Sequence, residues 1–338
     1  MEEKIITKEN LIKLSSELVN EGYNVIAPTE KGYTLMRADT EINLGDDNRP
    51  PKGSFKEYVF PKSEPLFYYK KGKTDYEFVD VNLENTKNVF LAAKPCDAAS
   101  VEILSKVFNW DYKDEFFDIR AENSLIISMA CKFHDDYCFC TSVGSSPVST
   151  KGSDIFMITL PDDKFAMRIV TDKGKQFIEK YSKYFSEGNP AESEKAISEI
   201  PIPEKSFDSE KVRQWLTDNF ESDYWDEVGS ICLACGQCAF TCPVCHCFDI
   251  EDEDYQYDEG RRMKNWDTCQ FEQFTLHASG HNPRDNQAKR YRQRVSHKFK
   301  YYVDKFDKIL CTGCGRCSRG CPVSIDIKEI VTGINNLN

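Results

Sequence analysis

The chain has 338 residues, of which 40% are hydrophobic, 12% aromatic and 30% charged, an ordinary composition for a folded protein of about two domains. It excludes a largely disordered chain, and no apolar run approaches the roughly 18 residues of a membrane-spanning helix. The formal net charge is −12, which argues against a nucleic-acid-binding surface as the main function. Because the first residues lack a basic start and a long apolar stretch, we expect a cytoplasmic protein without membrane insertion.

The first half of the chain alternates helical and extended patterns. In chain order, the predicted elements are a helix over 11–19, a strand over 23–27, a buried strand over 88–93, a helix over 97–108, a buried strand over 124–130, a hairpin over 155–170 and a helix over 173–185. This order predicts a mixed α/β domain over residues 1–188. No Gly-x-Gly-x-x-Gly follows a strand and no Gly-rich loop with Lys and Ser or Thr occurs, so we expect no common nucleotide site.

A change of composition separates the two halves. Residues 189–208 are rich in Pro, Ser and Glu, which is typical of a linker. A helix follows, capped by either Asp208 or Ser209. Its apolar residues at helical spacing are Val212, Trp215, Leu216 and Phe220. We therefore expect an α+β protein whose second, more helical domain covers residues 209–338.

The fifteen cysteines divide in the same way. Four lie between Cys96 and Cys140, and eleven lie between Cys232 and Cys321. In a long chain without secretory features, so many cysteines indicate metal or redox chemistry more than a disulfide framework.

The second half contains the same cysteine motif twice. C-x2-C-x2-C-x3-C-P begins at Cys232 and again at Cys311, and this is the pattern of bacterial ferredoxins with two [4Fe–4S] clusters. In that pattern the fourth cysteine of each motif binds the other cluster. The predicted ligand sets are Cys232, Cys235, Cys238 and Cys321 for one cluster, and Cys311, Cys314, Cys317 and Cys242 for the other. Gly236, Gly313 and Gly315 would let the backbone approach the clusters closely.

Zinc is the alternative at these motifs, but zinc ribbons use two C-x2-C pairs, not three cysteines within seven residues. The two motifs are far apart for a compact ferredoxin, with 68 residues between Cys242 and Cys311. We therefore expect a ferredoxin-like domain with a long insert over residues 243–310.

Seven further cysteines lie outside these ligand sets. Cys96 stands where a buried strand leads into a helix, Cys131 ends the next buried strand, and Cys138 and Cys140 follow in a loop. These four either hold a third [4Fe–4S] cluster or are ordinary buried cysteines. The insert adds Cys245, Cys247 and Cys269 as additional candidate metal ligands. Either they form a fourth cluster with His246, His277, His281 or another ligand, or they form a shell around the first two clusters.

The insert also carries two charged segments. Residues 249–259 contain seven acidic side chains, and residues 284–300 contain seven basic ones. The default interpretation is solvated surface. Electron-transfer proteins also dock through complementary charge, and the basic segment could instead offset negatively charged clusters.

Beyond these motifs, the sequence resembles the iron–sulfur electron-transfer subunits of anaerobic sulfite reductases and the beta subunits of cytosolic sulfhydrogenases. The resemblance runs from about residue 60 to 325. The stretches that carry it are Phe60-Pro61-Lys62-Ser63-Glu64, Lys94-Pro95-Cys96-Asp97, Cys138-Phe139-Cys140, Cys232 to Phe248, Trp266-Asp267-Thr268-Cys269, Gly280-His281-Asn282-Pro283-Arg284, Arg294, His297-Lys298 and Cys311 to Pro322. The Gly-His-Asn-Pro-Arg stretch is nearer the hydrogenase type.

This resemblance implies an electron-transfer subunit of an anaerobic oxidoreductase complex. Such a chain relays electrons between a flavin- and NAD(P)-binding subunit, or a ferredoxin, and a terminal hydrogenase or sulfite reductase. The resemblance also favours the third cluster at Cys96, Cys131, Cys138 and Cys140. On this interpretation the chain has no catalytic residues of its own. The alternative is a catalytic iron–sulfur oxidoreductase in which Cys245, Cys247 and Cys269 bind a small sulfur compound.

Overall fold

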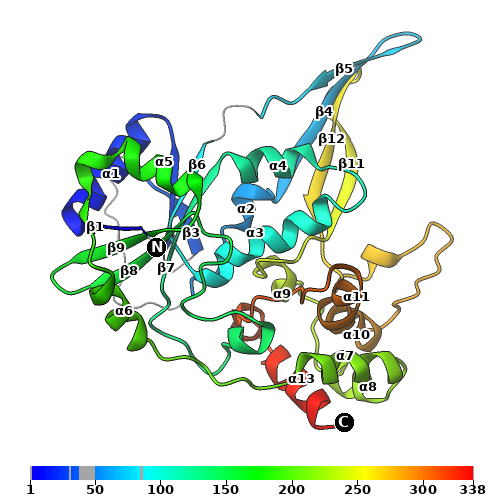
Figure 1. The fold of residues 1–338 in the computed structure, drawn as a ribbon. Coiled ribbons are helices and arrows are strands. Elements are labelled where there is room, and N and C mark those ends of the chain that lie inside the picture. Colours follow the sequence, from blue (N-terminus) through cyan, green and yellow to red (C-terminus); the bar gives the residue numbers. More distant parts are fainter. Residues whose placement is uncertain (1, 30–31, 38–49, 84–86, 338) are drawn as a thin grey trace.

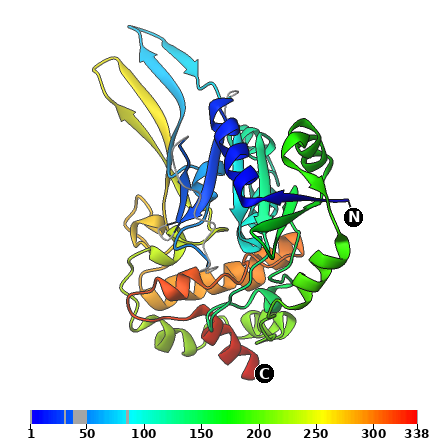
Figure 2. The same cartoon turned by 90° about the vertical axis from the view of Figure 1, so that its left-hand side faces the viewer.

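The computed structural model describes residues 2–29, 32–37, 50–83 and 87–337. They form a mixed eight-stranded sheet with helices on both faces, a smaller four-stranded sheet that projects from the body, and a helical region at the C-terminal end (Figures 1 and 2). The α+β class predicted from the sequence is confirmed.

The eight-stranded sheet has the order β10-β1-β9-β8-β7-β6-β2-β3. Its strands are β1 (Glu3–Thr7), β2 (Asn24–Thr29), β3 (Gly32–Leu35), β6 (Asn88–Ala93), β7 (Ser124–Met129), β8 (Ile155–Leu160), β9 (Lys164–Ile169) and β10 (Ser186–Glu187). The central strands β2, β6, β7 and β8 are parallel. Every residue of β6 and β7 is buried, which explains their continuous apolar sequences. The predicted strands and the hairpin of β8 and β9 are confirmed.

Two helical layers cover this sheet. On one face, α1 (Lys8–Asn20) and α5 (Asp172–Lys180) pack against the sheet through a shared apolar core. On the other face lie α2 (Lys56–Val59), α3 (Pro95–Phe108) and α4 (Glu115–Glu122), with a second core that contains Phe90 and Phe117. The helix predicted over 173–185 ends at Lys180, and the 3-10 turn η2 (Ser182–Tyr184) follows it.

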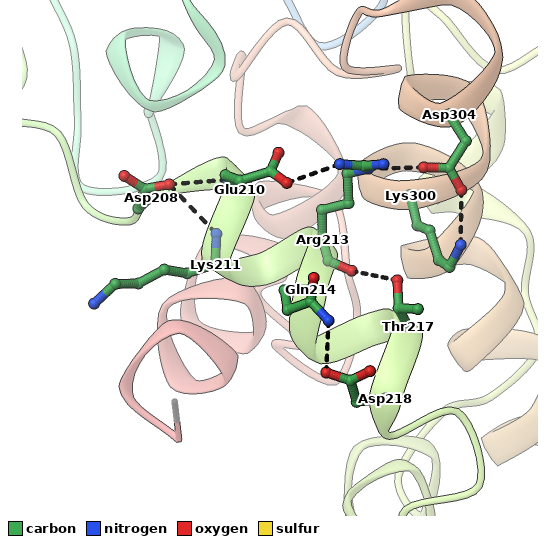
Figure 3. A network of polar contacts seen from close by, with 9 residues as sticks. All are labelled: Asp208, Glu210, Lys211, Arg213, Gln214, Thr217, Asp218, Lys300 and Asp304. Atoms are coloured by element: carbon green, nitrogen blue, oxygen red, sulfur yellow. Dashed lines mark hydrogen bonds and ion pairs between the residues drawn. The ribbon is translucent and has the colours of Figure 1, made fainter.

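The segment expected as a linker begins with a helix, α6 (Pro190–Ser198), whose Ala196 and Ile197 pack against the core next to β8. The next helix is α7 (Ser209–Asp218), and its cap is Asp208. The Asp208 carboxylate accepts hydrogen bonds from the backbone N–H groups of Glu210 and Lys211 at 2.9 and 3.4 Å (Figure 3). The sequence left Asp208 and Ser209 as alternatives, and the structure selects Asp208.

The remaining helices surround the ferredoxin motifs. They are α8 (Tyr224–Gly229), α9 (Gln237–Phe240), α10 (Gln287–Ser296), α11 (Tyr302–Phe306), α12 (Arg316–Arg319) and α13 (Ile327–Asn336). A π-helical turn, η4 (His297–Tyr301), joins α10 to α11. This part of the molecule also contains the 3-10 turns η1 (Cys140–Val143) and η3 (Gln273–Thr275). A core built on Trp215, Val295, Phe299 and Ile334 holds α7, α10 and α13 together.

The smaller sheet joins residues from both halves of the chain. It consists of β4 (Ser63–Lys71), β5 (Tyr76–Asp80), β11 (Phe248–Asp254) and β12 (Glu259–Trp266), in the order β11-β12-β4-β5. The central pair is β12 with β4, so a hairpin of the insert lies beside a hairpin of the first half. At its base, buried Lys264 pairs with Glu64 at 2.8 Å and with Asp114 at 3.1 Å. These pairs connect the projecting sheet to α4.

The acidic segment forms most of this hairpin. Its carboxylates are paired within the sheet: Glu253 with Arg261, Asp252 with Arg262, and Asp254 with Lys71, each at 2.8 Å. Much of the negative charge seen in the sequence is therefore balanced by neighbouring strands. Among the described residues, no helix is long and apolar enough to cross a bilayer.

Candidate metal centres

The first site lies at one edge of the large sheet. Strands β6 and β7 are parallel neighbours, so the segments that follow them emerge side by side. Cys96 stands in the first turn of α3, directly after β6, and Cys131 follows β7 by two residues. Cys138 lies in the loop that leads into η1, and Cys140 is the first residue of η1. The four thiols predicted to share a cluster thus meet at one place in the fold.

These thiols line one hollow, and Cys314 of the second ferredoxin motif lies on the same wall. The motif packs directly on the loop, since the Phe139 N–H donates to the Gly313 carbonyl at 2.9 Å. A Cβ at Gly313 would lie 2.5 Å from the Cys140 nitrogen. Gly313 is required by this close approach and by its φ of +65°.

Two arginines of the second motif extend the contact. Arg316 forms a bidentate pair with Asp97, the neighbour of Cys96, at 2.7 and 2.6 Å. Both side chains are almost fully buried, with exposures of 1% and 0%. Arg319 pairs with Asp135 and also donates to the Cys138 sulfur at 3.1 Å. The sequence did not predict this electrostatic connection between the halves.

The second site combines the two ferredoxin motifs. The site is a hollow lined by residues of both motifs. The cysteines on its wall are Cys232, Cys235, Cys238, Cys317 and Cys321. Four of these are the predicted ligand set, including the Cys321 exchanged from the other motif. Gly236 has φ +73° and Gly315 has φ +69°, so both glycines adopt the left-handed backbone that suits tight cluster-binding loops.

Several N–H groups point at the sulfurs of these motifs. The backbone N–H of Ile325 donates to the Cys321 sulfur at 3.3 Å, and that of Gly313 donates to the Cys311 sulfur at 3.4 Å. The side chain of Gln287 donates to the Cys232 sulfur at 3.4 Å. Such hydrogen bonds stabilise negative charge on sulfur and tune cluster potentials.

The predicted ligand set of Cys311, Cys314, Cys317 and Cys242 lies between these two hollows. Cys314 borders the first hollow and Cys317 borders the second. The buried Lys298 ammonium donates to the Cys242 sulfur at 3.4 Å and to the Leu310 carbonyl at 3.0 Å. Burial raises the pKa of Cys311 to about 12 and that of Cys238 to about 12. In the metal-free chain these thiols are therefore protonated near neutral pH, and metal binding would displace the protons.

The thiols are arranged around hollows and do not converge on single points. In the part of the chain that the structure describes, no three His, Cys, Asp or Glu side chains converge closely enough to hold one metal ion. The cysteines instead line hollows, which fits a group with several separate attachment points. All fifteen cysteines are free thiols. This arrangement fits [4Fe–4S] clusters better than mononuclear zinc sites.

The three leftover cysteines lie at the base of the β11–β12 hairpin. Cys247 immediately precedes β11 and Cys269 follows β12. The thiols of Cys247 and Cys269 are in hydrogen-bond contact, and so are those of Cys245 and Cys242. The hydrogen bond from Cys247 is the main cause that lowers the pKa of Cys269 to about 6. Two of the histidines named with them, His277 and His281, face each other in an exposed loop. His246 stands between Cys245 and Cys247 in the chain, and its ring packs against Phe108 and His297.

The basic segment is largely internal. Arg290, Arg294 and Lys298 are buried. Lys289, Arg292 and Lys300 pair with acidic side chains, as Figure 3 shows for Lys300, Asp304 and Arg213. Arg294 donates to the Cys245 sulfur at 3.4 Å and to the Cys238 carbonyl at 2.8 Å. Of the interpretations left open by the sequence, these contacts agree with the one in which the basic segment offsets the negative charge of the clusters.

Comparison with known proteins agrees with this arrangement. Residues 231–325 match the family model of the 4Fe-4S dicluster domain. Over 337 residues the chain is 29% identical to sulfhydrogenase 2 subunit beta from Pyrococcus furiosus, covering 95% of this chain and 97% of that protein. No solved structure matches. The expected resemblance to sulfhydrogenase beta subunits is thus confirmed, and the C-terminal part of the chain is an iron–sulfur domain of the [4Fe–4S] type.

Proposed function

We propose that this chain is the electron-relay subunit of a multi-subunit oxidoreductase. It passes electrons through [4Fe–4S] clusters between a flavin- and NAD(P)H-binding module, or a ferredoxin, and a terminal catalytic subunit of hydrogenase or sulfite reductase type. The fifteen free thiols suit a reducing, cytoplasmic compartment. The similarity to a sulfhydrogenase beta subunit supports the assignment to such a complex.

The observation that carries this proposal is the contiguity of the three thiol sets. One motif contributes Cys314 to the wall of the N-terminal hollow and Cys317 to the wall of the other hollow. The Cys311, Cys314, Cys317 and Cys242 set would therefore lie next to both of the other sets and could pass electrons between them. Electron transfer weakens steeply with distance, so an unbroken series of clusters is what a relay needs.

The proposed ligand sets also suit transfer more than bond-making. Four cysteines leave no iron open to a substrate, and hydrogen bonds and exposure set the potential of each cluster. Within this proposal, the N-terminal set of Cys96, Cys131, Cys138 and Cys140 holds the third cluster. Arg319 and Arg316 stabilise negative charge beside that set.

A two-part assay tests the relay. The cluster-loaded chain alone, supplied with NAD(P)H and sulfite, polysulfide or protons, should give no turnover, although dithionite should reduce its clusters. Adding a flavoprotein that oxidises NAD(P)H and an electron acceptor protein should restore electron flow through the chain. Turnover by the isolated chain at a rate typical of enzymes, with flavin absent, would show instead that it is catalytic.

A further inference from the structure

We propose that Cys245, Cys247 and Cys269 hold an additional iron–sulfur cluster at the base of the β11–β12 hairpin. Three observations carry this inference: the hairpin gathers the thiols, three buried cations surround them without acidic partners among the described residues, and one buried donor lacks a hydrogen-bond partner. The inference is independent of the direction of electron flow and of the partner subunits.

The hairpin explains how distant cysteines meet. Phe248 pairs with Trp266 at the first register position of β11 and β12. The ladder continues for one more bond, because the Asp267 N–H donates to the Cys247 carbonyl at 3.0 Å. Cys247 and Cys269 are therefore fixed at the base of the hairpin, at the end opposite its turn, and their thiols lie close together. Cys245 lies two residues earlier, and Lys56 donates to its carbonyl at 2.8 Å.

The surrounding cations need a negative group. Lys56, Arg294 and Lys298 are each only 2% exposed. Among the residues that the structure describes, none of the three forms an ion pair with a carboxylate. Arg294 and Lys298 instead donate to cysteine sulfurs, and Lys56 lies over the Trp266 ring at 3.8 Å from its centroid. Uncompensated buried charges are very costly. Lys298 lies beside Cys242 of the middle ligand set, and an anionic metal–thiolate group at Cys245, Cys247 and Cys269 would compensate Arg294 and Lys56.

A buried nitrogen of Arg294 that lacks a hydrogen-bond partner also supports a cluster at this place. The Nε of Arg294 is buried and has no hydrogen-bond partner within the described part of the chain, whereas the other guanidinium nitrogens contact Cys245 and Cys238. Buried donors are nearly always satisfied. A sulfide of a cluster held by the neighbouring thiols would be a suitable acceptor. A single metal ion has no acceptor atom to offer the Arg294 Nε. In addition, no three His, Cys, Asp or Glu side chains of the described residues converge closely enough to hold one ion.

The first test is the metal content of the full-length chain, loaded without oxygen. The double variant Cys247→Ala/Cys269→Ala should lose about two to four irons per chain, the content of one cluster, with matching sulfide. The electron paramagnetic resonance signals of the other clusters should persist. The matched control is Cys138→Ala/Cys140→Ala, and its loss should add to that of the first pair. Unchanged iron, or the loss of one zinc ion in place of iron, would overturn the proposal.

A second test does not depend on removing cysteines. Arg294→Lys keeps the charge but removes the planar donor group, so it should shift the midpoint potential of the signal that the Cys247→Ala/Cys269→Ala variant loses. Arg292→Lys, in the same helix α10 and paired with Glu221, should leave every potential unchanged. If the Arg294 variant leaves all potentials at their wild-type values, the cluster does not lie beside Arg294 and the inference fails.

Discussion

At the scale of single residues, the exchanged fourth cysteine makes the sharpest prediction. Cys321 lies on the same hollow as Cys232, Cys235 and Cys238, although it belongs to the other motif. Cys321→Ala should therefore remove the cluster of the first motif, with a loss of up to about four irons per chain. Cys242→Ala should instead damage the cluster of Cys311, Cys314 and Cys317. Iron analysis and electron paramagnetic resonance distinguish the two clusters, and a loss confined to the Cys311 cluster in the Cys321 variant would contradict the exchange.

His297 gives a pH prediction. Burial and the nearby His246 and Lys298 lower its pKa from 6.5 to about 4, so the folded chain holds it neutral. As pH falls below 6.5, His297 binds a proton in the unfolded chain but not in the folded chain. The free energy of unfolding therefore decreases until pH reaches about 4. Between pH 8 and pH 5 the unfolding free energy should decrease by about 2 kcal/mol because of this residue.

Anaerobic urea unfolding of wild type and His297→Gln at several pH values measures this effect. The variant should lose less stability on acidification, whereas the exposed His277→Gln control should follow the wild-type pH dependence. Equal slopes for wild type and His297→Gln would mean that His297 is protonated normally in the folded chain.

At the scale of elements, the sequence predicts best where local pattern and burial agree. The apolar runs of β6 and β7 predict their strands because a central parallel strand is buried on both faces. The helix at 97–108 also appears, as part of α3. The cysteine spacing predicts the thiol set at the Cys232 hollow because a short motif fixes its own loop geometry.

The projecting sheet could not be predicted in this way. Strand β11 consists largely of acidic residues and is mostly exposed, so it shows no buried face and its alternation carries no signal. It is stabilised by cross-strand ion pairs with β12 and by the pairing of β12 with β4. Strand β4 lies far from β12 in the chain, and such long-range pairing leaves no local trace in the sequence.

The basic segment shows the same limit. Its composition leaves open a solvated surface, a docking surface or a segment that offsets negative clusters, and α10 and η4 turn Arg290, Arg294 and Lys298 inward, as the third interpretation expects. What reverses the expectation is the group of thiols on the facing loops, which only the fold brings together. Charge pattern alone cannot distinguish a helix face that meets water from one that meets thiolates.

At the scale of the whole molecule, the two halves are joined around the thiol sites. The β4–β12 pairing connects them on one side, and the second ferredoxin motif contacts the N-terminal hollow on the other. The buried Arg316–Asp97 pair lies at this second contact, where Asp97 follows Cys96 and Arg316 precedes Cys317 in the chain. Asp97 is also the acceptor for the Tyr33 hydroxyl at 2.8 Å.

This pair gives a prediction about how the halves are held together. Arg316→Gln leaves the Asp97 carboxylate buried without a counter-charge, which typically costs about 3–5 kcal/mol. The double variant Arg316→Met/Asp97→Asn removes both charges and should recover much of that loss, because the penalty comes mainly from the unpaired charge. Anaerobic unfolding free energies of Arg316→Met, Asp97→Asn and the double variant measure the coupling, because a double-mutant cycle needs the same substitutions made singly and together.

The same variants should change the metal content in a specific order. Arg316→Gln loosens the wall that the second motif forms for the N-terminal hollow, so iron at Cys96, Cys131, Cys138 and Cys140 should be lost first. Iron at the Cys232 hollow, on the far side of the motif, should be retained longer. Simultaneous loss from all sites would show that the pair stabilises the fold as a whole and not the contact between the halves. Retention of all iron with little change in unfolding free energy would mean that the β4–β12 pairing is sufficient to hold the halves together.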